Sequence, residues 1–516
     1  MAKTERKDCF LDTEMKNRLW CTFLLVLLVF LMLLGLFYLP HTDIYGKDLR
    51  RVNIMSDIQH RDESGNIIAE VKADSADGYV EKTIDSAAVK VKQMAYVDSV
   101  PTGMVAIEDF ADVNGINREM DHFYSALSQA SSRPVRIAYF GDSYIEGDIL
   151  TMDLRAMLQK RFGGRGMGFV EIECVSSDFR RSVNTRHSGW QCYHANERGR
   201  GFNAISQGIA GSYFIPHDTA TFEMTCQRNV YPQLLDTASV ATVFFTPGNG
   251  LNVYCGINRN ANELIYSNGT ASAAHTHEET IAYLDSDSVT RYKTVIKANN
   301  IPQQGAGNVV ARKIERRIGR LRLGVKGGNG SRFYGVALDG KKGIVLDNFS
   351  MRGSGGQHLA KIPQETLSSF AAVRPYDLII LHFGLNVASA KQKDYGTYAR
   401  QMAQVVQHIK AAYPNASILI VSMADRDMRG ADGQLHTMGG VRELISYERK
   451  MASDERVAFW NLYEAMGGDG SVARMTEKKQ ANLDYTHINF AGGKHIAGLL
   501  FNVLMNGKSN YDSRMR

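Results

Sequence analysis

The sequence lacks the cysteine spacing that marks many metal sites. Its 516 residues include six cysteines, and these form no close Cys-x-x-Cys or His/Cys pattern, so no zinc site is expected. An excess of one charge is also missing, because 60 basic and 54 acidic residues leave a net charge of only +6. A nucleic-acid-binding protein would show a concentrated basic face. We therefore predict no metal, no other cofactor and no nucleic-acid partner.

One long apolar run stands near the N-terminus. Residues Leu19 to Leu39 carry no charge and are followed by Pro40, and about 20 apolar residues span a bilayer as a helix. A cleaved signal peptide is the alternative, but its apolar core is usually about 7–15 residues long and is followed by small residues at the cleavage site. The apolar run here is longer, and Phe37–His41 contains no small residues. We expect a cytoplasmic tail (1–18), an uncleaved transmembrane anchor (19–39) in the cell inner membrane, and all that follows on the periplasmic side.

Residues 40–105 are polar and lack strong periodicity, which is typical of a segment that buries no core. We interpret them as a stalk that holds the following domains off the membrane, with a small accessory fold as the alternative. Four cysteines would then be exported into a compartment that permits disulfides, and four allow three pairings. They are Cys174, Cys192, Cys226 and Cys255.

After residue 105, apolar runs alternate with helical patterns in two separated parts of the chain. This alternation predicts a doubly wound α/β fold of three layers, with a mostly parallel sheet between helices. The expected strands are 135–140, 168–172, 343–348, 376–383, 416–422 and 457–462, and the clearest helices are 148–162, 395–412 and 492–504. The domain is expected in two parts, 106–200 and 343–516.

The pattern changes between these two parts. Residues 201–342 contain no convincing long helix, only short β-rich runs punctuated by Gly, Asn and Asp. Many short strands with turn residues between them predict a β-sandwich. Because the α/β pattern stands on both sides, we expect this sandwich to be inserted within the α/β domain.

Polar blocks follow the expected strands. Gly141-Asp142-Ser143-Tyr144 ends an apolar run, and a serine at a strand-to-helix turn places its hydroxyl beside the free N–H groups of the helix's first turn. Asp484-Tyr485-Thr486-His487 can place an imidazole beside its orienting carboxylate. Two further blocks, 347–353 and 382–386, lie between them. Sites in such sheets lie at the carboxyl ends of the strands.

With these blocks in this order, the chain resembles the SGNH hydrolases, also called the GDSL family, over residues 106–200 and 343–516. The resemblance implies a serine hydrolase that needs no cofactor. Ser143 would attack an ester carbonyl, His487 would act as general base and then general acid, and Asp484 would orient the imidazole.

The same resemblance implies an oxyanion hole. Its donors would be the Ser143 N–H, the Gly353 N–H and the side-chain amide of Asn386. Gly355 and Gly356 stand close enough to Gly353 to be alternatives. Many family members carry Asp after this asparagine where the present chain has a valine, but the amide donor is unaffected.

Other polar residues in the blocks have two interpretations. Asp142, Tyr144 and His382 are candidates to line the substrate pocket. For Asp142 we favour a structural role, in which the carboxylate satisfies backbone donors of the turn. His382 is equally well placed to be a hydrogen-bonded core histidine. Glu146 and Asp148 are expected to favour the N-terminus of the following helix through its dipole.

An exported SGNH domain with an inserted β-sandwich resembles the cell-wall O-acetylesterases of bacteria. In those enzymes a carbohydrate-binding-like module accompanies the removal of acetyl groups from peptidoglycan sugars. The resemblance implies a carboxylic ester hydrolase whose partner is an acetylated polysaccharide. Two alternatives stay open: an O-acetyltransferase that uses the same triad on envelope glycans, and a non-enzymatic envelope scaffold.

Overall fold

The computed structural model describes residues 43–44, 47–48, 95–111, 118–197, 201–226, 238–268, 276–284, 290–298 and 309–516. The expected tail (1–18), the expected anchor (19–39) and most of the expected stalk (40–105) lie outside the described residues. Within the part that is described, no helix combines the length and the apolar character needed to cross a membrane.

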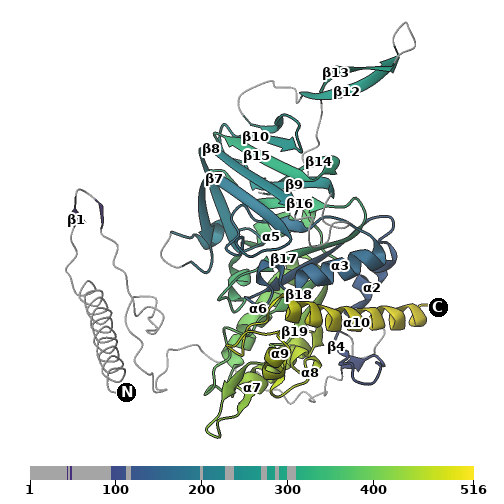
Figure 1. The fold of residues 1–516 in the computed structure, drawn as a ribbon, viewed down its shortest axis with the longest axis vertical. Helices are drawn as coiled ribbons and strands as arrows, with labels where there is room; N and C mark the ends of the chain where they lie inside the picture. The colour runs from purple at the N-terminus through teal and green to yellow at the C-terminus, as the bar shows by residue number, and fades with distance from the viewer. Residues whose placement is uncertain are drawn as a thin grey trace, which may run out of the picture. The chain divides into compact units, whose positions relative to one another are not determined.

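Backbone contacts divide the chain into one unit of Met1–Lys90 and another of Val91–Arg516. The first contains a short antiparallel pair, β1 (Asp43–Ile44) and β2 (Lys47–Asp48). The second contains all the other described elements (Figure 1). It includes β3 (Tyr96–Val97), so part of the expected stalk belongs to the folded unit.

A seven-stranded sheet forms the α/β part of the second unit. Its strand order is β17-β5-β18-β19-β22-β4-β3. The first five strands run parallel, whereas β4 is antiparallel to β22 and β3 to β4. The strands are β4 (Ile107–Asp109), β5 (Pro134–Gly141), β17 (Gly343–Ser350), β18 (Leu378–His382), β19 (Ser417–Val421) and β22 (Ala458–Trp460). The prediction of a mostly parallel sheet is confirmed.

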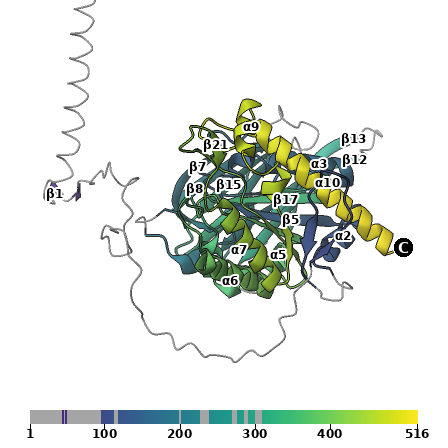
Figure 2. The same ribbon diagram turned by 90° about the horizontal axis from the view of Figure 1, so that it is seen from below.

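Helices cover both faces of this sheet (Figure 2). α10 packs along α3 and α2 on one face, and α5, α6 and α7 lie side by side on the other. Their bounds are α2 (Asp121–Ser128), α3 (Thr151–Phe162), α5 (Gln364–Val373), α6 (Gly396–Ala412), α7 (Val441–Asp454) and α10 (Phe490–Arg514); α8 (Leu462–Ala465) and α9 (Ser471–Glu477) are short. The three-layer architecture is therefore as predicted.

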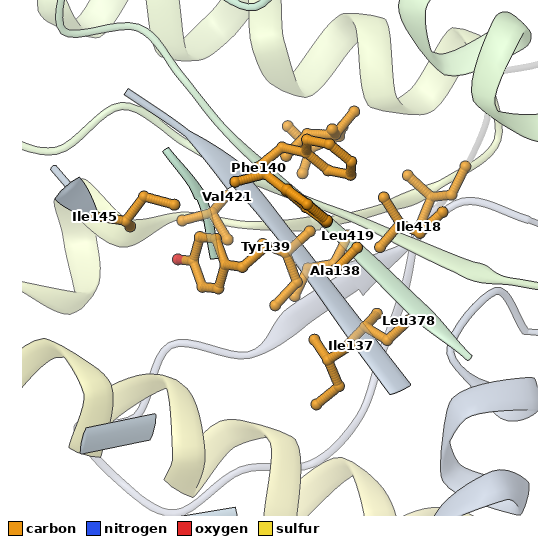
Figure 3. Close-up of a cluster of buried hydrophobic side chains, with 14 of the residues drawn as sticks. Ile137, Ala138, Tyr139, Phe140, Ile145, Leu378, Ile418, Leu419 and Val421 are labelled. Carbon is orange, nitrogen blue, oxygen red and sulfur yellow. The ribbon is translucent and has the colours of Figure 1, made fainter. Parts of the chain in front are cut away.

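The centre of the sheet is apolar on both sides. From β5, Ile137, Ala138, Tyr139 and Phe140 point alternately to the two helix layers and meet side chains of β18 and β19 (Figure 3). A strand buried on both faces has a continuous apolar sequence, which is why β5 was visible in the sequence. The next two strands of this sheet along the chain lie on opposite sides of β5, with β17 on one side and β18 on the other. The end of β5 is thus the topological switch point, where sites form in such sheets.

The second sheet has nine strands, in two runs. One run is β7-β8-β15-β10-β11 and the other is β6-β16-β9-β14, and a single residue pair, Phe333 with Phe214, links them. The strands are β6 (Gly168–Val170), β7 (Val183–His194), β8 (Ser212–Cys226), β9 (Ala238–Thr246), β10 (Asn252–Ile257), β11 (Glu263–Ser267), β14 (Val310–Ile318), β15 (Arg320–Lys326) and β16 (Arg332–Asp339). β12 (Thr276–Leu284) and β13 (Thr290–Ala298) form a separate two-stranded antiparallel sheet.

The two runs face each other across one apolar cluster that draws side chains from every strand of both. Trp190 of β7 meets Phe333 of β16 at 5.1 Å between ring centres, and Tyr266 of β11 meets Phe245 of β9 at 5.0 Å. These pairs join strands that are not hydrogen-bonded neighbours. The packing is therefore that of two sheets face to face, as predicted for the insert.

The outer face of the β6-β16-β9-β14 run is buried against the α/β part. Phe244 of β9 and Tyr334 of β16 belong to the same apolar cluster as the α/β core, and both contact Phe370 of α5, at 6.0 and 5.2 Å between ring centres. Phe169 of β6 contacts Phe349 of β17 at 5.3 Å. The insert is thus joined to the α/β part by a continuous core.

Three local predictions differ from the structure. The strand expected at 168–172 is not part of the parallel sheet, because β6 pairs antiparallel with β16. The second sheet therefore begins before the expected boundary at residue 201. The helix expected from residue 148 begins at Thr151, after a 3-10 turn, η1 (Glu146–Asp148), because Asp148 has a φ of 62°. The last helix runs to Arg514, ten residues beyond its expected end.

Candidate active site

Ser143 stands in the turn directly after β5, and the Asp142 side chain holds this turn. Asp142 Oδ1 accepts a hydrogen bond from the Tyr144 N–H at 3.0 Å. Asp142 Oδ2 accepts one from the Leu385 N–H at 3.3 Å. The carboxylate therefore joins the serine turn to the loop after β18, and burial raises its pKa to about 7.

His487 lies against Ser143 and is itself oriented by Asp484. His487 Nε2 is 3.2 Å from Ser143 Oγ, and His487 Nδ1 is 2.7 Å from Asp484 Oδ2. Because a carboxylate only accepts, Nδ1 carries the proton and Nε2 is left to accept the serine proton. The three residues form one hydrogen-bonded chain.

Backbone contacts fix the loop that carries the imidazole and its carboxylate. Asp484 Oδ1 accepts from the N–H groups of Thr486 and His487, each at 3.0 Å. Burial alone would raise the pKa of Asp484, but its hydrogen bonds with His487 and Thr486 lower it overall, so the group is a carboxylate at neutral pH. Just beyond the loop, Asn489 caps α10 by accepting from Ala491 and Gly492. The loop thus has little freedom to move the ring.

Asn386 and Gly353, two of the expected oxyanion donors, lie in the loops that follow β18 and β17. Asn386 is exposed after β18, and its Nδ2 donates to the carbonyl oxygen of Ser354 at 3.1 Å. Ser354 directly follows Gly353, which is exposed with a φ of 76°. A side-chain amide carries two donor hydrogens, so one stays available for an oxyanion while the other holds the Gly353 loop.

The three side chains considered for the pocket lie in the core instead. Asp142, Tyr144 and His382 are 1%, 2% and 2% exposed. His382 Nδ1 lies 3.1 Å from the Tyr139 hydroxyl, and burial lowers the pKa of His382 to about 3, so the ring is neutral. The Tyr144 hydroxyl donates to Met466 Sδ at 3.6 Å. These side chains therefore pack in the core beneath the serine turn and are not exposed to a substrate.

Asp148 has a larger role than the predicted dipole contact with a helix. Its side chain is fully buried and accepts from Thr151 Oγ1 at 2.8 Å, Asn348 Nδ2 at 2.9 Å and Arg180 Nε at 3.0 Å. Burial alone would raise the pKa of Asp148, but the charges of Arg180 and Arg155 lower it overall. This role could not be predicted, because the partners of Asp148 are far away in sequence and its positive φ leaves no local sequence pattern.

An ion pair also joins the serine turn to the Gly353 loop. Arg352 donates to Glu146 through Nε and Nη2, both at 2.7 Å. Asn196, just after β7, donates to the Arg352 carbonyl oxygen at 2.9 Å. Neither Arg352 nor Asn196 was predicted, because a pair that bridges two blocks becomes visible only when the fold brings the blocks together.

Replacing Asn386 with Ala should lower kcat for ester hydrolysis about 10²–10³-fold, the usual loss for one oxyanion donor. The substitution also frees the Ser354 carbonyl, so the Gly353 loop loses one tether. Steady-state kinetics on p-nitrophenyl acetate measures the effect. Gln392→Ala is the matched control, since this exposed amide of the same loop region donates to the Asp394 carbonyl oxygen. Equal losses in both variants would contradict the donor role.

Comparison with known proteins finds likeness in structure alone. No protein-family model matches the chain, and no curated protein sequence matches it. A solved structure described as a peptidoglycan O-acetylesterase superposes with a TM-score of 0.58 over 78% of this chain and 99% of its own, at 17% identity. A family two carbohydrate esterase from Cellvibrio japonicus gives a TM-score of 0.24 at 10% identity over 63% of this chain and 99% of its own, too low to establish a common fold. The chain therefore shares its fold, over 78% of its length, with the first of these structures.

Proposed function

We propose that the protein is a serine esterase that removes O-acetyl groups from an envelope polysaccharide, with peptidoglycan as the first candidate. The observation that carries the proposal is the hydrogen-bonded chain from Ser143 through His487 to Asp484 at the switch point of the sheet. A hydroxyl, an imidazole and a carboxylate in this geometry form the arrangement that activates a nucleophile.

The reaction would proceed through an acyl-enzyme. Ser143 Oγ attacks the acetyl carbonyl while His487 Nε2 takes its proton, and the developing oxyanion is held by the Ser143 N–H, the Gly353 N–H and the Asn386 amide. His487 then gives the proton to the leaving sugar hydroxyl. A water molecule, deprotonated by the same imidazole, attacks the acetyl-serine and releases acetate.

The exposure of the imidazole and the carboxylate beside Ser143 supports a polymeric substrate. Ser143 itself is 6% exposed, but the neighbouring His487 and Asp484 side chains are 41% and 48% exposed, so a bulky chain can lie against this edge of the sheet while its ester reaches Ser143. The fold shared with a protein described as a peptidoglycan O-acetylesterase makes that polymer the first to test.

The test is acetate release by the detergent-solubilised full chain from O-acetylated peptidoglycan, acetylated xylan and p-nitrophenyl acetate. We expect release from the first and third at rates well above those of the Ser143→Ala protein. Peptidoglycan stripped of its O-acetyl groups by mild base is the substrate control. A folded wild-type protein that cleaves none of the three would reject the esterase. Acetyl groups appearing on an added glycan instead of as free acetate would favour the transferase.

We also propose that residues 19–39, which lie outside the described residues, anchor the protein in the cell inner membrane with the catalytic domain on the periplasmic side. The protein should then sediment with membranes and stay there in high salt, because a spanning apolar helix is not released by screening charge. Protease added to spheroplasts should release a large soluble fragment. A mature N-terminus just beyond residue 39 would show that the run is a cleaved signal.

A further inference from the structure

Three side chains of the kinds that bind metal ions converge beside β7. Glu173 follows β6, and His187 and Cys192 lie on β7. One possible ligand atom of each lies within 4.8 Å of those of the other two. Glu173 Oε1 is 4.0 Å from His187 Nε2, and the Cys192 thiol hydrogen-bonds the Glu173 carboxylate. Ligand atoms around a tetrahedral zinc ion stand about 3.3–3.8 Å apart, so a small inward shift of the side chains closes the set.

A β-bulge brings two of these residues to one face. His187 and Cys192 are five positions apart, so in a regular strand they would point to opposite faces. The pairing of β7 with β8 is irregular between Ser188 and Trp190, since Ser188 pairs with Thr221 but Trp190 pairs with Pro216. β8 has three more residues than β7 at this point, and such an irregularity breaks the regular alternation of the strands. Gly189 in the bulge has a φ of 77°, and a Cβ there would lie 2.3 Å from the Thr219 carbonyl oxygen. The bulge explains why the sequence spacing showed no metal pattern.

A fourth residue orients the carboxylate. His194 Nε2 lies 3.2 Å from Glu173 Oε2, so the oxygen that does not face His187 already has a partner. The His194 side chain is only 6% exposed, which fixes its position. Carboxylates that bind metals are commonly held in this way by a neighbour behind them.

We propose that Glu173, His187 and Cys192 bind one divalent zinc ion, with His194 as a positioning residue. A thiolate, an imidazole and a carboxylate form a borderline-soft ligand set that suits zinc better than magnesium or calcium. The Glu173 and His187 side chains are 36% and 32% exposed, so the ion enters from solvent. Binding displaces the thiol proton of Cys192 to water and leaves a fourth position for water.

The ion would fasten the segment after β6 to β7. That segment also holds the serine turn, because Ser176 Oγ accepts from the Gly147 N–H at 3.1 Å and Arg180 donates to Asp148 at 3.0 Å. Zinc would thus stabilise the segment that hydrogen-bonds the serine turn, without contacting Ser143, His487 or Asp484. The role is structural, and chelation should leave kcat on p-nitrophenyl acetate unchanged at temperatures where the protein stays folded.

The experiment uses the full chain, purified under reducing conditions, stripped with chelator and titrated with Zn²⁺ or Co²⁺. We expect one equivalent to bind, Co²⁺ to give a thiolate charge-transfer absorption, and the Tm to rise with Zn²⁺ because the ion binds the folded state. Cys192→Ala and His187→Ala should weaken binding by more than about 100-fold, and His194→Ala by about 10–100-fold. The matched controls are Cys255→Ala, a free buried cysteine of β10, and His217→Ala, an exposed histidine of β8.

Either of two results would overturn the proposal. The first is zinc binding with unchanged affinity in both Cys192→Ala and His187→Ala. The second is no zinc binding by the folded wild-type chain when thiol titration shows Cys192 reduced. The His187 side chain is 32% exposed at the surface, so its variant should fold. This keeps the test decisive even if a change at Cys192 disturbs the sheet. Repeating the titration in Ser143→Ala separates zinc binding from the proposed esterase activity.

Discussion

Replacing Ser143 with Ala should lower kcat/KM for p-nitrophenyl acetate by at least about 10³-fold, because the acyl-enzyme can no longer form. Ser143 Oγ has one side-chain partner in the described part of the chain, His487 Nε2 at 3.2 Å. Its loss leaves no buried group unsatisfied, so the Tm should change little. Steady-state kinetics with circular dichroism on the same preparation checks both expectations.

His487→Ala should cause a loss of similar size, and the double variant should lose no more than either single one. The reason is that the serine and the imidazole act in one step, so removing either disables the other. A matched control exists in the chain. His436 pairs with Asp432 at 2.7 Å, as His487 does with Asp484. This pair is exposed on the hairpin of β20 (Asp427–Arg429) and β21 (Leu435–Thr437).

His436→Ala should therefore keep its activity close to that of the wild type. Ser446→Ala, on the exposed face of α7, is the corresponding serine control. A His487→Ala protein that keeps more than about a tenth of the wild-type rate would contradict the general-base role. Additive losses in the double variant would show that the two residues act in separate steps.

The parallel strands could be predicted because burial on both sides writes a continuous apolar run into the sequence. β5, β17, β18, β19 and β22 all lie where such runs were found. The pairing partner of a strand leaves no such mark. β6 has the same apolar character but pairs with β16, 166 positions later, through Val170 and Val336. Because this partner could not be predicted, the expected start of the second sheet was too late in the chain.

The insert shows the same limit at the level of packing. Alternate residues of β9 face two different cores, since Phe245 belongs to the cluster between the two runs and Phe244 to the α/β core. The sequence of such a strand indicates burial but not which neighbour provides it. Excising the insert would uncover Phe370 and the apolar surface around it, so the two parts should unfold together.

The triad was predictable because its three residues stand in short blocks with a fixed order. The surrounding supports were not, because they join positions far apart in sequence. Asn348, for example, reaches Asp148 at 2.9 Å across 200 positions. For His382 the sequence left a pocket residue and a core histidine as alternatives, and the structure shows the neutral core residue. Proximity in sequence to a motif does not give the direction of a side chain.

Replacing Arg374 with Met should lower the free energy of unfolding by about 3–5 kcal/mol, the usual cost of removing one partner from a buried ion pair. Arg374 is 2% exposed. Its guanidinium donates to Asp347 at 2.6 and 2.7 Å and to Asp339 at 2.8 and 3.1 Å. Asp339 ends β16 of the insert and Asp347 lies on β17 of the parallel sheet, so the arginine joins the two parts.

Methionine has a similar volume and would leave both buried carboxylates without the guanidinium that binds them, with the partly buried Arg136 as the cation that still acts on both. Asp347 would keep two partners, the Tyr376 hydroxyl at 2.6 Å and the Phe169 N–H at 2.8 Å, which do not offset a charge. Arg320→Met is the matched control, because Arg320 binds Glu223 through two hydrogen bonds at the surface, where water replaces the lost contact. The control should shift the urea midpoint only slightly.

The loss should also depend on pH. Burial alone would raise the pKa of Asp347, but the charge and hydrogen bonds of Arg374, with the Tyr376 hydroxyl, lower it overall. A carboxyl whose pKa is lower in the folded state stabilises the fold above its unfolded pKa and loses this contribution as the pH falls through the folded value. Without Arg374 the pKa of Asp347 must rise, so protonation relieves the variant as the solution is acidified. Urea unfolding at neutral pH and near pH 4 should show that the difference in free energy of unfolding between wild type and Arg374→Met becomes smaller at the lower pH. A difference that stays constant or becomes larger would mean that Arg374 acts through packing alone.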